Sequence, residues 1–282
     1  MIILSGTGTG KTVAFLLPIL TKLNADLQEI QAMIIVPSRE LALQIEQVAR
    51  QLGAGFKINA IYGGRSGSKD REELKHKPAL LIGTPGRVAD RIRRESFATE
   101  HIHTLVLDEF DKSLEIGFEE EMTEIIGALS SLKNRVLTSA TQGVDIPDFV
   151  GLVKPKYVNH LKETGLNLKI VDIPTSDRGR LDTVSSALCH LGRQRGIVFC
   201  NFKDSISEVS EELERKGISH ECFYGGLEQK DRERALIKFR NGTTNILLAT
   251  DLAARGIDVP ELDFIIHYEL PYKKEEFVHR NG

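Results

Sequence analysis

The sequence predicts an α/β protein made of two tandem domains, each a parallel sheet flanked by helices. Short apolar runs such as AMIIV at 32–36 alternate with stretches of helical periodicity, which is the order of βα units. The 282 residues suffice for two domains of about 150 residues each. The second half also repeats the order of features found in the first half, which indicates a duplicated domain.

Two intervals of equal length carry this repeat. Ile35 precedes Tyr62 by 27 residues, and Ile197 precedes Tyr224 by the same number. Each interval begins in an apolar run that predicts a strand. The same features then follow in both halves: Tyr-Gly-Gly, then Lys-Asp-Arg-Glu (69–72 and 230–233), then a strand ending in threonine (Leu80–Thr84 and Ile246–Thr250).

The polar, glycine-containing segment LKETGLN at 161–167 is the predicted linker between the domains. It gives 1–160 as the N-terminal domain and 168–282 as the C-terminal domain. Only the N-terminal domain has a glycine-rich loop of the phosphate-binding type. We therefore expect the nucleotide to be bound by the first domain, with a cleft between the two.

Strands and helices alternate along the first half. Apolar runs give the strands, and amphipathic periodicity gives the helices, the second of which should end at Gly53. Most of the strands end in small, polar or charged residues, at the edge where open α/β sheets bind ligands. The predicted strands are 2–4, 32–36, 57–62, 79–82, 104–107, 135–138 and 157–159, and the first two helices are 13–23 and 41–52.

The stretch SGTGTGKT at 5–12 has the character of a phosphate-binding loop. It follows the first strand and precedes the first helix, so its backbone N–H groups can converge on a phosphate at a helix N-terminus. Lys11 would reach the β- and γ-phosphates, and the Thr12 hydroxyl would bind Mg²⁺. The nucleotide-binding prediction covers Ser5, Gly6, Thr7, Gly8, Thr9, Gly10, Lys11 and Thr12.

Asp108 and Glu109 follow directly after the strand at 104–107. From this position one carboxylate can hold Mg²⁺ through water while its neighbour orients the attacking water. The alternative is that the two acids cap the helix that follows. Lys11, Asp108 and Glu109 are the predicted catalytic residues, and Thr12 and Asp108 the predicted metal ligands.

Composition excludes several classes of protein. A net charge of −3 and a pI near 6.3 give no general basic signal, so nucleic-acid binding would have to come from local patches. The three cysteines lack C-x-x-C spacing, which argues against a zinc site and a disulfide scaffold. We interpret Cys189, Cys200 and Cys222 as small core residues of a protein in a reducing, cytoplasmic compartment. No apolar run approaches the ~20 residues of a membrane span.

Eight short motifs together resemble the DEAD-box RNA helicases, in the order of that family and over nearly the whole chain. They are SGTGTGKT (5–12), PSRELA (37–42), GG (63–64), TPGR (84–87), DEFD (108–111), SAT (139–141), QKDR (229–232) and ATDLAARGID (249–258).

The resemblance implies an RNA-dependent ATPase, built from two RecA-like domains, that separates short RNA duplexes with ATP and Mg²⁺ as cofactors. It implies a monomer that contacts the RNA backbone with little sequence specificity and has no membrane association. Gly256 and Asp258 would complete the nucleotide site. Asp111, Ser139, Thr141 and Arg255 would couple the domains. The implied RNA contacts are Pro37, Arg39, Gly63, Gly64, Thr84, Arg87, Arg232 and Thr250.

Simpler interpretations compete for three of these arginines. Arg39 and Arg87 could form surface ion pairs, and Arg232 lies in a charge-rich helix whose face could simply be solvated. The family's adenine-reading segment lies before the phosphate loop, whereas four residues precede Ser5 here, and the later arginines of the motif HRxGRxGR lie beyond Gly282. We expect this chain to be a fragment with impaired turnover.

Two other functions are weighed against the helicase. One is a nucleotide-gated RNA-binding clamp or scaffold without efficient ATPase activity, which the shortened end favours and the intact Glu109 disfavours. The other is a small-molecule kinase that uses the same loop, which leaves the duplicated domain unexplained.

Overall fold

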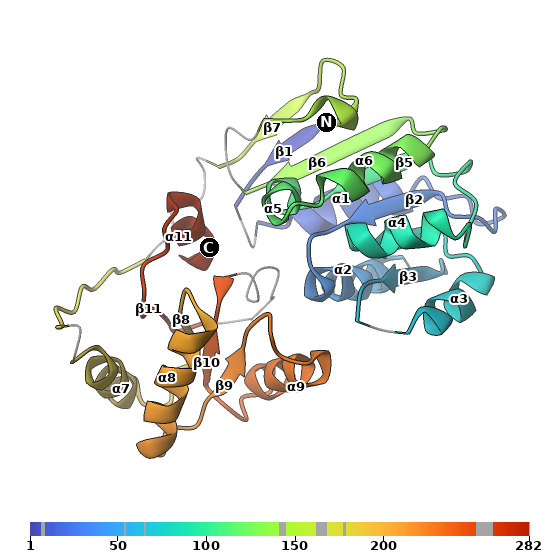
Figure 1. Cartoon of the computed structure of the whole chain (residues 1–282). Coiled ribbons are helices and arrows are strands. Elements are labelled where there is room, and N and C mark those ends of the chain that lie inside the picture. Colours follow the sequence, from blue (N-terminus) through green and yellow to red (C-terminus); the bar gives the residue numbers. More distant parts are fainter. Residues whose placement is uncertain are drawn as a thin grey trace. The chain divides into compact units, whose positions relative to one another are not determined.

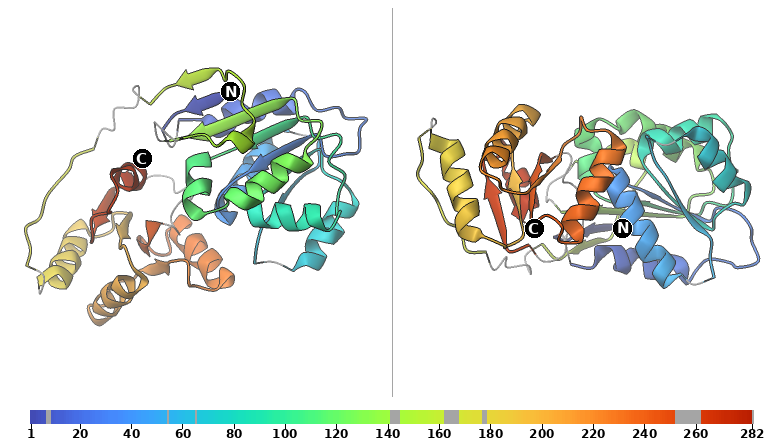
Figure 2. Two further views of the ribbon diagram at one scale, coloured as in Figure 1. Left: turned by 45° about the horizontal axis from the view of Figure 1, so that its top comes forward. Right: turned by 90° about the horizontal axis from the view of Figure 1, so that it is seen from below.

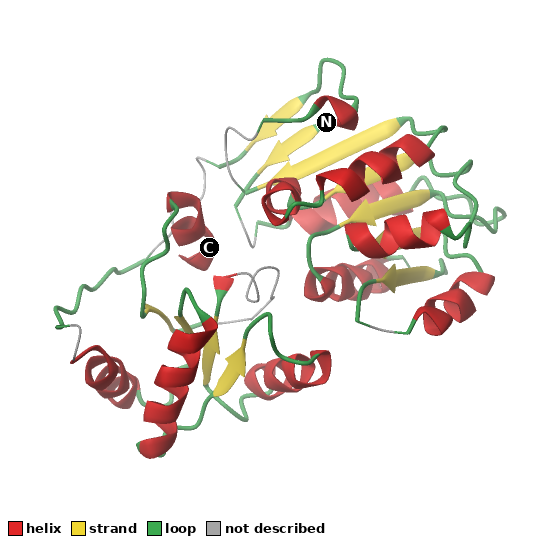
Figure 3. Ribbon diagram, viewed as in Figure 1, coloured by secondary structure: helices red, strands yellow, loops and turns green. Residues whose placement is uncertain are grey.

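The computed structural model describes residues 1–6, 9–53, 55–64, 66–140, 145–161, 168–176, 179–251 and 262–281. The chain divides into two compact units, Met1–Gly165 and Leu166–Gly282 (Figure 1). The division falls inside the predicted linker, of which only Leu161 is among the described residues. Helices and strands alternate in both units (Figure 3), as the predicted α/β class requires.

The first unit is built on a seven-stranded sheet in which every described pairing is parallel. The strand order is β3-β4-β2-β5-β6-β1-β7. All seven predicted strands are confirmed, with ends that shift by one residue or less. They are β1 (Ile2–Leu4), β2 (Ala32–Ile35), β3 (Ile58–Ile61), β4 (Leu80–Gly83), β5 (Thr104–Leu107), β6 (Asn134–Ser139) and β7 (Tyr157–Asn159).

Helices cover both faces of this sheet (Figure 2). Alternate residues of β2 point to opposite faces, so Ile34 packs with helices α1 and α2, whereas Met33 and Ile35 pack with helices α3 to α6. All these strand residues are fully buried. The helices are α1 (Lys11–Leu20), α2 (Arg39–Leu52), α3 (Gly67–Lys75), α4 (Pro85–Arg93), α5 (Phe110–Ile116) and α6 (Glu119–Ala128), and one 3₁₀ turn covers Asp148–Val150.

The first two helices begin earlier than the apolar periodicity predicts. Gly10 has φ 85°, a left-handed conformation that glycine adopts without strain, and α1 begins directly after it at Lys11. The Ser38 hydroxyl accepts a hydrogen bond of 3.2 Å from Leu41 N, so α2 begins at Arg39. Periodicity marks only the buried stripe, whereas the caps set the ends. For the same reason α1 ends at Leu20, before the predicted 23.

The second unit holds a four-stranded parallel sheet in the order β11-β8-β10-β9. Helices α7 and α8 pack on one face of this sheet and α9 on the other. The strands are β8 (Gly196–Phe199), β9 (Glu221–Phe223), β10 (Ile246–Ala249) and β11 (Phe264–His267). The helices are α7 (Arg180–Leu191), α8 (Lys203–Arg215), α9 (Gln229–Arg240) and α11 (Lys274–Asn281).

The second sheet repeats the order of the first four strands of the seven-stranded sheet, with β9-β10-β8-β11 standing for β3-β4-β2-β5. Ala32 pairs with Leu80 as Gly196 pairs with Ile246. This register makes Phe199 the counterpart of Ile35, so the predicted match of Ile35 with Ile197 is wrong by two residues. The connection from this strand to Tyr-Gly-Gly is therefore two residues shorter in the second unit. The equal spacing of the two intervals in the sequence did not show this difference.

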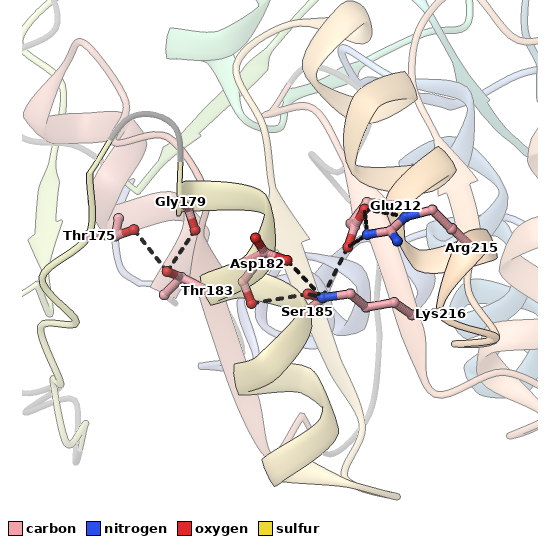
Figure 4. A network of polar contacts seen from close by, with 8 residues as sticks. All are labelled: Thr175, Gly179, Asp182, Thr183, Ser185, Glu212, Arg215 and Lys216. Atoms are coloured by element: carbon pink, nitrogen blue, oxygen red, sulfur yellow. Dashed lines mark hydrogen bonds and ion pairs between the residues drawn. The ribbon is translucent and has the colours of Figure 1, made fainter.

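A polar network joins α7 to the end of α8 (Figure 4). The Lys216 ammonium lies 3.0 Å from Asp182, 3.0 Å from Glu212 and 2.7 Å from the Ser185 hydroxyl. Hydrogen bonds from Lys216 to Glu212 and Asp182 raise the pKa of the Lys216 ammonium. Arg215 also pairs with Glu212 at 2.8 Å. Because these groups reach solvent, the network orients two helices more than it stabilises the fold.

The cysteines only partly match the predicted core positions. Cys200 is fully buried, and burial raises the pKa of its thiol to about 12. Cys222 is half-buried and Cys189 is exposed, so the prediction is wrong for Cys189. Val184 and Leu188 carry the buried stripe of α7, and the residue after Leu188 lies outside it. None of the helices in the described part of the chain combines the length and apolar character that crossing a bilayer requires.

Gly83 tests how tightly the sheet and α4 pack. A Cβ at Gly83 would overlap the Val88 side chain and lie 2.9 Å from the Ile61 carbonyl oxygen, whereas a Cβ at Gly86 would meet nothing within 4 Å. We expect Gly83→Ala to lower the free energy of unfolding by roughly 1–3 kcal/mol. Gly86→Ala, the matched control, should be neutral or stabilising by up to ~1 kcal/mol. Urea unfolding followed by circular dichroism measures both, and equal midpoints would contradict the packing described.

Candidate functional site

The strand order of the first unit sorts the predicted site residues into two adjacent groups. Strands β5, β6 and β1 are neighbours, and their carboxyl ends carry the acidic pair, Ser139 and the phosphate loop. Strands β3, β4 and β2 are also neighbours, and their carboxyl ends carry the residues predicted to bind RNA. Since all these strands are parallel, the two groups share one edge of the sheet.

Hydroxyl and backbone hydrogen bonds hold the phosphate loop. Ser5 N donates to Ser139 O at 3.1 Å, which ties the start of the loop to the end of β6. The Ser5 and Thr9 hydroxyls lie 2.6 Å apart, and Thr9 Oγ1 donates to Gly6 O at 2.8 Å. Ser5 is therefore a structural part of the loop. Thr7 and Gly8 lie outside the described residues.

Lys11 lies at the first position of α1, half-buried and close to the acidic residues. Its ammonium donates to Ser5 O at 2.6 Å. Burial lowers the pKa of this ammonium, and the nearby Asp108, Glu109 and Asp111 carboxylates act in the opposite direction. Thr12, the next residue of α1, is also half-buried. The lysine is thus held over the loop by one carbonyl, in a cluster of acids.

Asp108 is buried at the end of β5 and fixed by its neighbours. Its Oδ1 accepts from the Thr138 hydroxyl and, at 3.2 Å, from Glu109 N. Burial raises the pKa of this carboxyl, while the Thr138 bond and the Lys11 charge oppose the rise. The sequence analysis did not single out Thr138. Its position directly before the SAT motif, on the strand beside β5, was the available signal.

Glu109 has an unusual backbone. Its φ of 47° places a non-glycine residue in the left-handed region, and Glu109 N also donates to Thr138 Oγ1 at 3.2 Å. Glu109 is the N-cap residue of α5, but its side chain makes no capping hydrogen bond, which disfavours the alternative that it serves as a helix cap. Burial first, and then the Asp108 and Asp111 charges, raise the pKa of Glu109 to about 7. Strained backbone and a raised pKa are typical of functional sites.

The donor set fits Mg²⁺. Asp108, Glu109 and Asp111 repel one another, and a divalent cation would relieve this repulsion. Carboxylate and hydroxyl oxygens are the ligands that Mg²⁺ takes, usually few of them and completed by phosphates and water. Among the described residues, no group of three or more Asp, Glu, His or Cys side chains is placed to hold a metal ion by itself. Asp108 and Thr12 remain the predicted ligands.

The predicted coupling residues are only partly described. Asp111 and Ser139 are buried, next to the acidic pair and the phosphate loop respectively. Thr141 and Arg255 lie outside the described residues, as do the predicted nucleotide ligands Gly256 and Asp258.

Arg39 and the Gly63-Gly64 turn come together at the ends of β2 and β3. A Cβ on Gly64, which has φ 84°, would overlap the Arg39 guanidinium, so the arginine covers the turn closely. Pro37 is buried between β2 and α2. Thr84 is buried after β4 and donates its N–H to Ile61 O at 3.2 Å.

Arg87 forms an ion pair across two helices. Its Nε lies 2.5 Å from Asp70 Oδ2, and the Asp70 side chain is completely buried. The sequence analysis weighed a surface ion pair for Arg87, and the structure gives a buried partner instead. Asp70, part of the repeated Lys-Asp-Arg-Glu motif, had no role in the sequence analysis.

The second unit places the two described RNA candidates around β9. Thr250 N donates to Phe223 O at 3.3 Å, the counterpart of the Thr84 bond to Ile61. The Arg232 guanidinium lies over the Phe223 ring, 4.8 Å from its centroid, so a purely solvated position is wrong for Arg232. The unit thus repeats the backbone geometry of the first.

Arg280 is a buried hub that sequence reasoning missed. It donates to Asp251 at 2.5 and 2.6 Å, to Asn201 Oδ1 at 2.6 Å and to Glu269 O at 2.7 Å. These partners follow strands β10, β8 and β11. One guanidinium therefore ties together three strand ends of the second sheet, a role that no local pattern announces.

A model of the DEAD/DEAH box helicase family matches residues 1–149, and a model of the helicase conserved C-terminal domain matches residues 179–282. The chain belongs to the DEAD-box helicase family. Its relatives include the DEAD-box ATP-dependent RNA helicase CshA of Geobacillus kaustophilus, which is 33% identical over 98% of this chain and 60% of its own length. The ATP-dependent RNA helicase eIF4A of Eremothecium gossypii is 35% identical over 98% of this chain and 72% of its own.

Solved structures agree with the assignment of this DEAD-box chain. S. cerevisiae Dbp5 bound to RNA and ADP BeF3 is 26% identical, with a TM-score of 0.83 over 99% of this chain and 74% of its own. Mss116p bound to ssRNA and AMP-PNP is 25% identical, with a TM-score of 0.78 over 99% of this chain and 62% of its own. The DEAD-box chain spans about 60% of the length of CshA from G. kaustophilus and of DbpA from Bacillus subtilis.

The raised pKa of Glu109 makes the stability of the DEAD-box fold depend on pH. A carboxyl whose pKa rises from 4.5 to about 7 on folding stabilises the folded state below pH 4.5, and this contribution is lost as pH rises to 7. We expect the free energy of unfolding of Glu109→Gln to rise relative to that of the parent by about 2 kcal/mol as the pH increases from 5 to 8. Urea unfolding in buffer without nucleotide and Mg²⁺ measures it, with the exposed Glu120→Gln as control. A difference that stays constant with pH would refute the assignment.

Proposed function

We propose that this chain is the core of an ATP-dependent RNA helicase of the DEAD-box type, which couples ATP binding and hydrolysis to local RNA unwinding or remodelling of RNA–protein complexes. One observation carries the proposal. The phosphate loop, Lys11 and the Asp108-Glu109 pair converge from β1 and β5, and Thr138 on β6, between them, binds Asp108. The names of the relatives CshA and eIF4A support it.

The nucleotide would lie at the phosphate loop. Backbone N–H groups at the N-terminus of α1 would face its phosphates, and the Lys11 ammonium would leave Ser5 O to bind them. Bound Mg²⁺ would neutralise charge on the phosphate oxygens. Asp108 and Thr12 would hold this ion, and its charge would lower the pKa of the neighbouring acids.

Glu109 would orient the hydrolytic water and take up its proton. The backbone at this residue is left-handed, and its N–H donates to Asp108 Oδ1 and Thr138 Oγ1, which hold that conformation. The charge of bound Mg²⁺ would favour the carboxylate form of Glu109, which is the form that can accept a proton from water. Ser139 and Thr141 would transmit the state of the site.

RNA would lie across the ends of β2, β3 and β4, on Arg39, Gly64, Thr84 and Arg87, with Arg232 and Thr250 from the second unit. Guanidinium groups and exposed backbone N–H groups bind phosphates without reading bases. The proteins Dbp5 and Mss116p were solved with RNA, which supports this proposal. We also propose a cytoplasmic location, which the three free thiols support, and a monomeric state.

The central test is hydrolysis of ATP with and without single-stranded RNA. We expect RNA to stimulate turnover, and Lys11→Ala and Glu109→Gln each to lower it by roughly 10²-fold or more. Lys22→Ala, an exposed lysine just beyond α1, should have no effect.

The alternatives give different results in the same assay. A clamp or scaffold would bind RNA in a nucleotide-dependent way with negligible turnover, and Glu109→Gln would then change nothing. A small-molecule kinase would show no response to RNA. Slow ATP hydrolysis by this polypeptide stays a prediction, and the rate measured in the same assay tests it.

Gly64 offers a test of RNA binding with a control for backbone strain. A methyl group at Gly64 would displace the flexible Arg39 guanidinium, whereas at Gly55, which also has a positive φ, it would meet nothing within 4 Å. We expect Gly64→Ala to weaken binding of single-stranded RNA about 5-fold or more and Gly55→Ala to change it little. Adding Arg39→Ala to Gly64→Ala should then cost nothing further, and a full additional loss would exclude the contact as the cause.

A further inference from the structure

We propose that Asp70 is a positioning residue for RNA, which holds the Arg87 guanidinium in the orientation that accepts a phosphate. The proposal rests on the proposed function, in which Arg87 contacts the RNA backbone. Asp70 is not in any of the motifs that carry the family resemblance, and it acts through Arg87 from a different helix.

The contact is short and shielded. Asp70 Oδ2 lies 2.5 Å from Arg87 Nε, the Asp70 side chain has no exposed surface, and the Arg87 side chain is 15% exposed. Low exposure limits the screening of this ion pair by water and salt. Arg87 is thus anchored on its buried side and reaches solvent on the other.

Helix α3 is docked so that Asp70 cannot easily move away. Leu74, one turn further along α3, is buried in the main core. At the start of α3, Arg91 donates to Gly67 O at 3.5 Å, and a Cβ on Gly67 would come within 3.2 Å of Arg91 Nη2. Arg87 and Arg91 lie one turn apart on α4, so both face α3.

The chemistry of the guanidinium explains what this anchoring achieves. An arginine side chain loses rotamer freedom when it is fixed, and its planar fork binds a phosphate well only in the right orientation. Asp90 is a weak competitor for Arg87, at 3.9 Å from Nη1, because Arg94 and Arg91 bind Asp90 and lower its pKa to about 2.

The second copy of the Lys-Asp-Arg-Glu motif indicates that the burial of Asp70 is specific to its pairing with Arg87. Asp231 has the same place in the Lys-Asp-Arg-Glu motif, at the start of α9, and it is exposed. A repeated βα unit therefore folds with this aspartate in water. In the first unit the aspartate is instead buried against an arginine at the RNA-facing edge.

The proposal and the effect of charge alone predict opposite changes in RNA affinity, which makes the proposal testable. Asp70→Asn removes a negative charge near a surface proposed to bind phosphates, so charge alone predicts tighter RNA binding. Positioning predicts weaker binding, because Arg87 loses its anchor. Glu72→Gln is the matched control, since it removes the same charge from an exposed position on α3, where Glu72 pairs with Lys75.

The experiment measures the dissociation constant of a fluorescent oligouridine for the full chain with AMP-PNP and Mg²⁺, over a range of salt concentrations. We expect Asp70→Asn to weaken binding about 5- to 20-fold and Glu72→Gln to leave it equal or tighter. In an Arg87→Ala background, Asp70→Asn should change binding less than about 2-fold. Affinity for a fluorescent ADP analogue at the phosphate loop should be unchanged, which a general loss of structure would not allow.

Asp70→Glu covers the case in which Asp70→Asn does not fold. It keeps the charge but moves the carboxylate by one methylene, so weaker RNA binding is again expected, with an unchanged salt slope. Asp70 variants that bind RNA as tightly as the parent would overturn the proposal. An Arg87→Ala variant with parental affinity would also overturn it while leaving the helicase function standing. A parent chain that binds no RNA would overturn both.

Discussion

The parallel pairing of β5, β6 and β1 is the constraint on which the candidate site depends. It places the ends of three strands, distant in sequence, side by side, so that Thr138 on β6 can hold Asp108 after β5 and Ser139 O can hold the phosphate loop after β1. The central strand β5 is buried on both faces, with Leu105 and Leu107 in one cluster and Val106 in the other, so its register is fixed by packing. The site therefore inherits its rigidity from the core.

The candidate site holds charged groups in unfavourable, buried positions on this rigid sheet. Burial raises the pKa of Asp108 and Glu109, and their mutual repulsion adds to the effect for Glu109. Burial lowers the pKa of Lys11 opposite them. Glu109 also has a left-handed backbone. Such an arrangement weakens the fold, and the core must compensate for it. This is the trade expected where charges are placed for a ligand and not for stability.

The sequence predicted the features that depend on neighbouring residues. It did not predict the contacts that depend on residues distant in the sequence. Apolar runs predict all seven strands of the first sheet, and the polar residues at their ends predict the positions of Lys11 and Asp108, because strand ends and loops are local features. The roles of Asp70 and Arg280 depend on partners 17 and 29 residues away, Arg87 and Asp251, which no periodicity encodes. The register error at Ile197 and the exposure of Cys189 have the same origin, since both are set by packing.

The duplicated topology shows how one position can serve structure in one copy and chemistry in the other. Asp108 N donates to Ile35 O at 2.9 Å, and Tyr268 N donates to the equivalent Phe199 O at 3.0 Å, so Glu109 and Glu269 are counterparts. The Glu269 carboxylate accepts from Asn201 N at 2.7 Å and Ser205 Oγ at 3.0 Å, at the start of α8. In the second copy the acid at this strand end binds the start of a helix. Glu109 makes no capping bond to α5, the helix that follows it, and is turned by a strained backbone into the acidic cluster that faces Lys11. The fold thus provides the position of the acid in both copies, and the phosphate loop beside β6, present only in the first copy, gives that position its chemistry.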